Sequence, residues 1–187
     1  MRADGERSQM VAGYPREDFA LAFFKGWAYS LFYGTSEQGA IKMLTPMQIA
    51  RYFLALTDED AGDSITNMKI QKLVYYAQGF HLAIYDKPLF LEPIEAWTHG
   101  PVIPILYHAF KQHGPESIPT PTDLDFSDYD DQIKDLLNEV YKVYGQFSAW
   151  KLRNMTHEEM PWVNATQGDG TISIDDLREY FKTLLVA

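Results

Sequence analysis

The sequence predicts a mainly α-helical fold, a single compact domain of about six helices with one extended or short-strand segment around residues 88–97. Apolar side chains recur at helical spacing in separate stretches after residue 44, and several of these stretches begin or end at a capping residue, a proline or a glycine. Two prolines, Pro88 and Pro93, exclude a helix in the region between the second and third stretches. No internal repeat is present.

Threonine caps mark the first two predicted helices. Thr45 precedes Pro46 and apolar residues at 49, 50, 53 and 54, which predicts a helix that ends before the acidic loop at 57–63. Thr66 precedes a longer stretch, residues 67–86, whose apolar side chains cover a broad arc. We expect this second helix to be the longest and the most buried.

An extended segment and a third helix follow. Residues 87–97 are predicted to be extended, with at most one or two short strands, because of their prolines and the alternation of their apolar side chains. Gly100-Pro101 is predicted to form the sharp turn into the third helix, within residues 102–114. Pro104 fits the first turn of that helix and Gly114 fits its end.

The C-terminal part is predicted to hold three more helices. An acidic, proline-containing loop leads to the fourth helix, over residues 130–145, and Ser148 caps a short fifth helix that runs to residue 159. Residues 161–171 are predicted to be a loop. Ser173 followed by Asp176 resembles a capping box before the last helix, residues 174–185.

Residues 1–44 differ from the rest and are predicted to be an aromatic leader outside the domain at 45–187. Seven aromatic residues lie within residues 19–33, but Lys25 interrupts this stretch and it is shorter than the ~20 residues that span a bilayer, so no membrane span is predicted. No secretory signal is predicted either. A docked amphipathic helix, a membrane-surface helix and an upstream extension before a natural start at Met43 or Met47 all remain open.

Charge and cysteine content bound the function. Five basic and five acidic side chains balance within residues 1–44, so the net charge of −10 lies in residues 45–187. An acidic body repels phosphate backbones and attracts basic proteins, so direct nucleic-acid binding is not expected. The chain has no cysteine, which excludes disulfides and thiolate chemistry and fits the reducing cytoplasm.

No catalytic or metal-binding motif is complete. The five histidines lie on separate segments, and none forms the H-E-x-x-H pair that places two metal ligands on one helical face. No G-x-S-x-G nucleophile elbow, phosphate-binding loop or EF-hand ligand series is present. We therefore predict no cofactor, no metal and no catalytic residue.

Two loop sequences share an unusual composition. "AWTHGP" (96–101) and "THEEMPW" (156–162) each combine threonine, histidine, proline and tryptophan. One structural hypothesis is that the two loops pair, with each imidazole bonded to the backbone of the other loop. In this interpretation Trp97 fills core, His99 bonds a backbone group, and Gly100 allows the tight turn.

Four blocks of the sequence carry a family resemblance. "KIQKLVYYAQGFHLAIYDKPLF" (69–90), "IEAWTHGPVIPILYHAFKQHG" (94–114), "SAWKLRNMTHEEMPWVNA" (148–165) and a terminal isoleucine and Tyr-Phe pair occur in this order. Together they resemble the Panacea domain of the SocA/GepA-like antitoxin family of bacterial and phage toxin–antitoxin modules. The likeness covers about residues 45–184. The leader has no helix-turn-helix of the kind that some relatives carry.

The resemblance implies a cytoplasmic, non-enzymatic antitoxin that binds and neutralises a cognate protein toxin. Neutralisation would occur by direct blocking, or by delivery of the toxin to an ATP-dependent protease. The family does not identify the toxin. The matching residues that we expect at or near the partner surface are Lys72, Tyr75, Tyr76, His81, Glu95, Trp97, His99, Trp150, His157 and Trp162, with Gly100 and Pro101 as a structural turn.

An enzyme or metalloprotein is the alternative. A hydrolase or a metal site would use His99 and His157 with the carboxylates of Glu95 and Glu158, and it would need these side chains to converge around a cleft. The two hypotheses therefore differ in where the structure places the two imidazoles.

Overall fold

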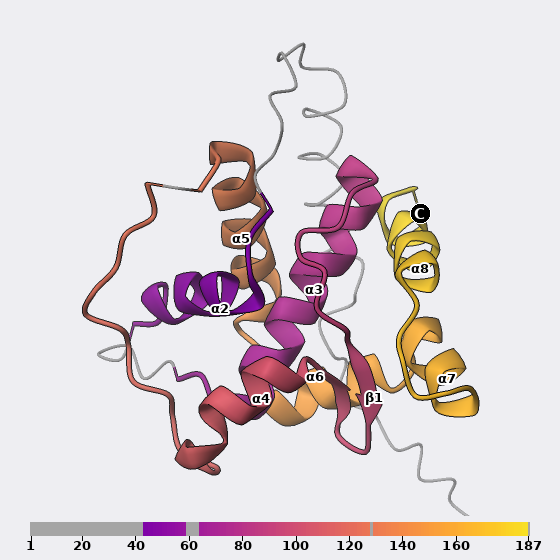
Figure 1. The fold of residues 1–187 in the computed structure, drawn as a ribbon, viewed down its shortest axis with the longest axis horizontal. Helices are drawn as coiled ribbons and strands as arrows, with labels where there is room; N and C mark the ends of the chain where they lie inside the picture. The colour runs from indigo at the N-terminus through magenta and orange to yellow at the C-terminus, as the bar shows by residue number, and fades with distance from the viewer. Residues whose placement is uncertain (1–42, 59–63, 128, 187) are drawn as a thin grey trace, which may run out of the picture.

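The computed structural model describes residues 43–58, 64–127 and 129–186, and it shows a mainly α-helical body with one small hairpin, which confirms the predicted fold class (Figure 1). The described residues form seven α-helices, one more than expected. Numbered as in Figure 1, the elements are α2 (Pro46–Ala55), α3 (Asn67–Tyr85), β1 (Glu95–Trp97), β2 (Gly100–Val102), α4 (Pro104–Phe110), the 3-10 helix η1 (Lys111–His113), α5 (Asp131–Tyr144), α6 (Ala149–Thr156), α7 (Met160–Gln167) and α8 (Ile174–Val186). The predicted leader lies outside the described residues except for its last two. None of the described helices has the length and hydropathy to cross a membrane.

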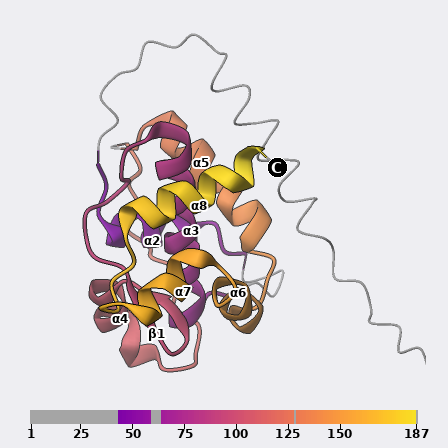
Figure 2. The same ribbon diagram turned by 90° about the vertical axis from the view of Figure 1, so that its right-hand side faces the viewer.

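Helix α3 runs through the middle of the molecule and contacts most other elements. Helices α2 and α5 pack on one side of it and α8 on the other, while α4, α6 and the hairpin surround its N-terminal half (Figures 1 and 2). Every residue from 69 to 84 is buried. The expectation that this helix is the longest and the most buried is confirmed.

Helix starts follow the predicted caps. The Thr45 hydroxyl accepts the Gln48 amide at 3.2 Å, and the Gln48 side chain accepts the Thr45 amide at 2.9 Å, which completes a capping box at α2. The hydroxyls of Thr66 and Ser148 accept amides in the first turns of α3 and α6. Ser173 likewise accepts the amides of residues 175 and 176 at the start of α8.

Two buried glutamine side chains on α3 provide hydrogen-bond partners for backbone groups of the extended segment, as a neighbouring strand would in a sheet. The Gln78 amide oxygen accepts the Leu89 amide at 2.8 Å and the Phe90 amide at 3.3 Å, and its amide nitrogen donates to the Phe90 carbonyl at 2.9 Å. The Gln71 side chain accepts the Ile103 amide at 2.8 Å. Buried backbone groups of residues 89, 90 and 103, on either side of the hairpin, are thereby paired without a sheet, which avoids the cost of leaving them unsatisfied.

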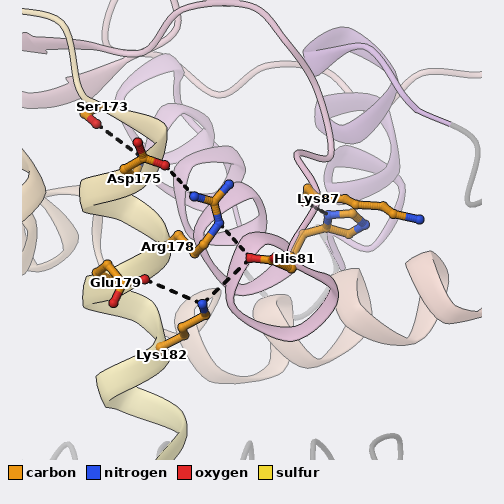
Figure 3. Close-up of polar contacts among 8 residues, drawn as sticks. His81, Lys87, Ser173, Asp175, Arg178, Glu179 and Lys182 are labelled. Atoms are coloured by element: carbon orange, nitrogen blue, oxygen red, sulfur yellow. Dashed lines mark hydrogen bonds and ion pairs between the residues drawn. The ribbon is translucent and has the colours of Figure 1, made fainter.

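The C-terminal end of α3 is fixed by His81 and Asp86, and Figure 3 shows His81 beside Lys87 together with Arg178 of α8. Nδ1 of His81 lies 2.6 Å from the Lys87 carbonyl oxygen, which can only accept, so Nδ1 carries the proton. Burial lowers the pKa of His81 to about 4, so the ring is neutral at neutral pH. Asp86, in the left-handed conformation at φ 55°, pairs with Arg178 of α8 at 2.9 Å.

Two predictions about local structure are wrong. Residues 161–171 are not all loop, because α7 occupies Met160–Gln167, and the fifth helix ends at Thr156 instead of continuing to residue 159. Pro161, the first residue of the predicted loop, lies in the first turn of α7, where its missing amide hydrogen has no helical acceptor to bond.

Gly100-Pro101 is not the turn before the third helix. Both residues belong to strand β2, which pairs antiparallel with β1, and the hairpin turn lies at Thr98-His99 instead. Pro101 is opposite Ala96, at the edge of the two-stranded sheet, where a missing amide is tolerated. The third helix begins later, at Pro104, and Gly114 follows the 3-10 turn η1 and not α4 itself.

Gly79 allows α3 and α8 to approach closely. A Cβ atom built at this position would lie 2.3 Å from Cε2 of Phe181, and both positions are fully enclosed. The Phe181 ring also makes edge contacts with Tyr75 and Phe80, at centroid distances of 5.7 and 4.9 Å. The ring therefore has no free space into which it can withdraw.

We predict that Gly79→Ala destabilises the protein by about 2 kcal/mol, although alanine favours an isolated helix over glycine, because the overlap must displace a packed ring. Chemical denaturation measures the loss. In a Phe181→Leu background, which removes the ring atoms nearest to position 79, the same substitution should cost clearly less. Equal costs in both backgrounds would show that the contact does not limit the packing.

Candidate functional site

The two tryptophan-containing loops lie together at the N-terminal end of α3. Hairpin β1–β2 carries the first loop sequence, and the junction between α6 and α7 carries the second. The indole nitrogen of Trp162 donates to the Trp97 carbonyl at 3.2 Å, which joins them. The paired-loop hypothesis is thus right about the pairing, but an indole and not an imidazole makes the cross-link.

Trp97 is a half-buried part of the surface rather than a core side chain, contrary to prediction. Its indole nitrogen donates to the Glu95 carboxylate at 2.6 Å, and its ring packs edge-on against Tyr107 of α4 at a centroid distance of 4.9 Å. The pairing orients both the carboxylate and the indole along the hairpin. Truncation of Trp97 should therefore cost less stability than the loss of a fully buried ring.

Lys72 supports the hairpin from below. Its Nζ donates to the Pro101 carbonyl at 2.9 Å, and only 1% of the residue surface is exposed. Burial, followed by the nearby Arg153 guanidinium, lowers the pKa of Lys72 to about 7. At neutral pH this buried amine is therefore present in both its charged and its neutral form.

Gly100 lies directly over this amine. Its φ of +91° favours glycine, and a Cβ atom there would lie 2.7 Å from the Thr156 hydroxyl and 2.8 Å from Cε of Lys72. The glycine is thus required for both its backbone conformation and its small size. The close approach places strand β2 on α3 and on the end of α6.

Glu159 anchors the second loop in the core. Its two carboxylate oxygens accept the hydroxyls of Tyr75 at 2.7 Å and Tyr76 at 2.8 Å, and Tyr76 stacks on Tyr144 at 3.8 Å. Burial, then the Glu159 charge, raises the pKa of both tyrosines well above 10, so they remain donors. Glu159 is also the N-cap residue of α7, but its side chain makes no capping hydrogen bond there.

The two histidines of the site differ in exposure. His99 is exposed on the hairpin turn and meets the edge of Trp150, which is 59% exposed, at a centroid distance of 5.7 Å. His157 stacks on Trp162 at 3.8 Å, and its Nε2 is buried without a hydrogen-bond partner. Burial and then the charges of Arg153, Lys72 and His99 lower the pKa of His157.

A groove of about 620 Å³ opens between the hairpin, α3 and α4. Trp97 and His99 line it from the hairpin, Met68 and Lys72 from α3, and Tyr107 from α4. The exposed ring of Trp150 stands next to it, through its contact with His99. The groove and this ring form one continuous surface, which we call the hairpin surface.

The structure separates the expected site residues by depth. Lys72, Tyr75 and Tyr76 lie beneath the hairpin surface, and His99 and Trp150 are exposed on it. His81 is bonded near the other end of α3. The remaining candidates are half-buried within the paired loops: Glu95, Trp97, His157 and Trp162.

The arrangement offers little to a hydrolase or a metal ion. One oxygen of Glu95 already accepts the indole hydrogen of Trp97. Within the described residues no group of three or more histidine and acidic side chains is placed to hold a metal. His157 lies near the cations of Arg153 and Lys72, which disfavours a further positive charge there.

Several residues on which the site depends were not singled out in the sequence. Glu159, Gln71, Gln78 and Arg153 were treated as ordinary polar positions. A signal for the glutamines was present, because they interrupt the apolar arc of the longest predicted helix. No comparable signal marks Glu159, because its partners lie more than 80 residues away along the chain.

Comparison with known proteins places these residues in one family. The family described as "Antitoxin SocA-like, Panacea domain" matches residues 70–163, which contain most of α3, the hairpin, helices α4 to α6 and the start of α7. The chain is also similar to the protein named Antitoxin SocA of Caulobacter vibrioides (strain NA1000 / CB15N), with 32% identity over 125 residues. The match covers 57% of this chain and 63% of that relative. No solved structure matches the chain.

We predict that Gly100→Ala is far more damaging than Gly170→Ala. Both glycines have a φ near +90°, but a Cβ atom at Gly170 would meet no atom within 4 Å. Gly170→Ala should therefore cost about 1 kcal/mol for backbone strain alone, and Gly100→Ala about 2 kcal/mol more for the overlap. Thermal or urea unfolding of the two variants makes the comparison, and equal losses would contradict the close contact with Lys72.

We also predict that stability rises with pH above neutrality because of Lys72. Its pKa of about 7 lies below the ordinary 10.5, so the unfolded chain binds more protons and unfolding becomes harder as pH increases. Between pH 7 and 9.5 the gain should reach about 3 kcal/mol. Lys72→Met should remove this slope, as measured by urea unfolding across the range, and a slope that persists in the variant would assign it to other groups.

Proposed function

Because the chain belongs to the family of SocA-like antitoxins with a Panacea domain, we propose that it is an antitoxin that binds and neutralises a protein toxin. The matched relative is named an antitoxin, and the chain spans 63% of its length. We propose that the protein acts in the cytoplasm and without catalysis. Two routes fit this role: the antitoxin blocks the toxin directly, or it presents the toxin to an ATP-dependent protease.

The exposure of Trp150 is the observation that supports the proposed location of the toxin contact. Trp150 exposes 59% of its surface at the second position of α6, although large aromatic side chains gain free energy when they are buried. It is also next to a groove and to the exposed His99. Exposed tryptophans beside grooves are typical of residues that dominate protein–protein binding energy. We propose that the toxin covers Trp150 and the hairpin surface.

The architecture of the loops supports binding over chemistry. The residues that the alternative hypothesis needs are committed to other contacts: Glu95 to Trp97, and His157 to the face of Trp162. The hairpin above Lys72 is held by side chains of α3 and by contact with α6. A rigid, aromatic surface binds a partner with a small loss of conformational entropy.

We predict that Trp150→Ala weakens neutralisation while the protein stays folded. The side chain is mostly exposed, so its loss should leave stability nearly unchanged but weaken toxin binding about 30-fold. The measurement is growth rescue on co-expression with the toxin, for which the protein encoded next to the antitoxin is the first candidate. Soluble protein level and thermal midpoint are measured alongside.

Leu91→Ala is the matched control, because Leu91 is 66% exposed on the extended segment, outside the hairpin surface. It should rescue growth as the unchanged protein does. Full rescue by Trp150→Ala would remove this residue from the interface. Toxin half-life in the presence of the antitoxin separates the two routes, since blocking leaves the toxin intact and an adaptor shortens its lifetime.

His99→Gln separates the binding protein from an enzyme within the same assay. Glutamine retains a donor and an acceptor but cannot act as a general base near neutral pH. A binding surface should tolerate this exchange, whereas a catalytic histidine would lose orders of magnitude in activity. If His99→Gln accumulates normally and binds the toxin yet fails to rescue, the hairpin is an active site.

A further inference from the structure

Among the residues that the structure describes, basic side chains without acidic partners lie in and near the groove of the hairpin surface. Lys72 and His99 line it, and Arg153 and His157 of the α6 segment interact electrostatically with them. The ion pairs found among the described residues involve other cations: Arg51, Lys134, Lys142, Arg178 and Lys182. Four like-charged or chargeable groups are thus gathered in one place.

Their effects on one another show that these groups lack compensation. Arg153 disfavours the charged form of Lys72, and Arg153, Lys72 and His99 all disfavour the charged form of His157. The nearest buried carboxylate described above, Glu159, is held by Tyr75 and Tyr76. An anion in the groove would reverse this mutual repulsion.

Lys72 has hydrogen-bonding capacity to offer such an anion. An ammonium group has three donors, and within the described part of the chain Nζ has one acceptor, the Pro101 carbonyl. Lys72 is among the residues that line the groove, although only 1% of its surface is exposed, so a carboxylate must enter the groove to reach Nζ. A carboxylate that takes the remaining donors would gain a charge-assisted hydrogen bond in a place of low solvent exposure.

The charge here is opposite to that of the protein as a whole. The chain has a net charge of −10, and residues 116–139 alone contain eight acidic and one basic side chain. The groove is therefore a place on an acidic protein where basic side chains gather without acidic partners in the part of the chain that the structure describes. A partner segment whose charged side chains are all basic would be attracted to the acidic body of the protein but repelled by the basic groups of the groove.

We propose that the groove of the hairpin surface binds an aspartate or glutamate side chain of the partner protein, flanked by apolar residues, with Lys72 as the group that receives the carboxylate. The groove is open to solvent on one side and also lined by Met68, Val102 and Tyr107, so an apolar chain can lie across it with one acidic residue pointing inward. The inference rests on the proposed antitoxin function and specifies the chemistry of the toxin segment.

This assignment couples binding to proton uptake. The free protein holds Lys72 with a pKa of about 7, and a carboxylate against Nζ would raise that value by favouring the ammonium form. Above pH 7 the amine must then take up a proton as the acidic segment binds. The dissociation constant should increase about tenfold per pH unit between pH 7.5 and 9.

The test uses the full-length protein and two blocked pentapeptides with leucines around a central residue, which is glutamate in one peptide and glutamine in the other. Titrations followed by amide NMR should show saturable shifts at Gly100 and at the Trp97 indole with the glutamate peptide. The glutamine peptide should bind at least tenfold more weakly at pH 7. Only the glutamate peptide should show the pH dependence.

Variants and calorimetry identify the titrating group. Lys72→Met should remove both the glutamate preference and the alkaline pH dependence, whereas His99→Gln and His157→Gln should retain the pH dependence above 7.5, because the proposed titrating group is Lys72. If Lys72→Met does not fold, proton uptake by the unchanged protein still decides the question. Calorimetry of the glutamate peptide in two buffers of different ionisation enthalpy should give an uptake approaching one proton at pH 8.

Three outcomes would overturn the inference: equal binding of the two peptides, no shift at the groove with either, or affinity for the glutamate peptide that does not change from pH 7.5 to 9. Binding only of a peptide with a free C-terminal carboxylate would also contradict it. The antitoxin function is tested separately by growth rescue. If folded Lys72→Met rescues growth as well as the unchanged protein does, the antitoxin function is retained. The groove is then excluded as the place where the toxin binds.

Discussion

The buried helix α3 is the constraint on which the rest of the structure depends. Its neighbours include a segment of 16 residues, 87–102, most of which has no regular structure, so many backbone groups of that segment need partners from elsewhere. Side chains of α3 supply them: Gln78 bonds residues 89 and 90, Lys72 bonds residue 101, and Gln71 bonds residue 103. Loss of any of these side chains would leave a buried polar group unsatisfied, which costs more than the bond itself contributes. The buried polar residues of α3 therefore stabilise the fold, as its apolar residues do.

This constraint also determines where the exposed residues lie. The hairpin is pressed onto Lys72 at Gly100, and the second loop is tied down by Glu159 through Tyr75 and Tyr76. Both loops are thereby fixed to the same helix, and Trp97 and Trp162 meet as a consequence. A surface built in this way keeps its shape without a partner, which suits a protein that must bind quickly and selectively. In the proposed binding role, the buried family residues would act by positioning the exposed ones.

The sequence was sufficient for what depends on local pattern, and insufficient for what depends on contacts distant in the chain. Caps and apolar spacing located the starts of α2, α3, α6 and α8, because these signals lie within a few residues of each helix end. Residues 161–167 were predicted to be a loop although they belong to α7, since proline at a helix start and proline after a helix end look alike locally. The pairing of the two loops was suggested by their shared composition, but its chemistry required the spatial arrangement. Nothing local could show that Glu159 lies between two tyrosines of α3.

The net charge of the protein and the local charge at the hairpin surface affect different steps of partner binding. An acidic body speeds the approach of a basic protein over distances of about a Debye length, roughly 8 Å in the cell. Contact at the hairpin surface is governed by groups a few ångströms apart, and there Lys72, Arg153, His99 and His157 lack acidic partners within the described chain. A toxin with an overall basic surface and one protruding acidic residue would satisfy both conditions. Such a combination would also favour selectivity, because a uniformly basic protein is attracted to the body but has no group that fits the groove.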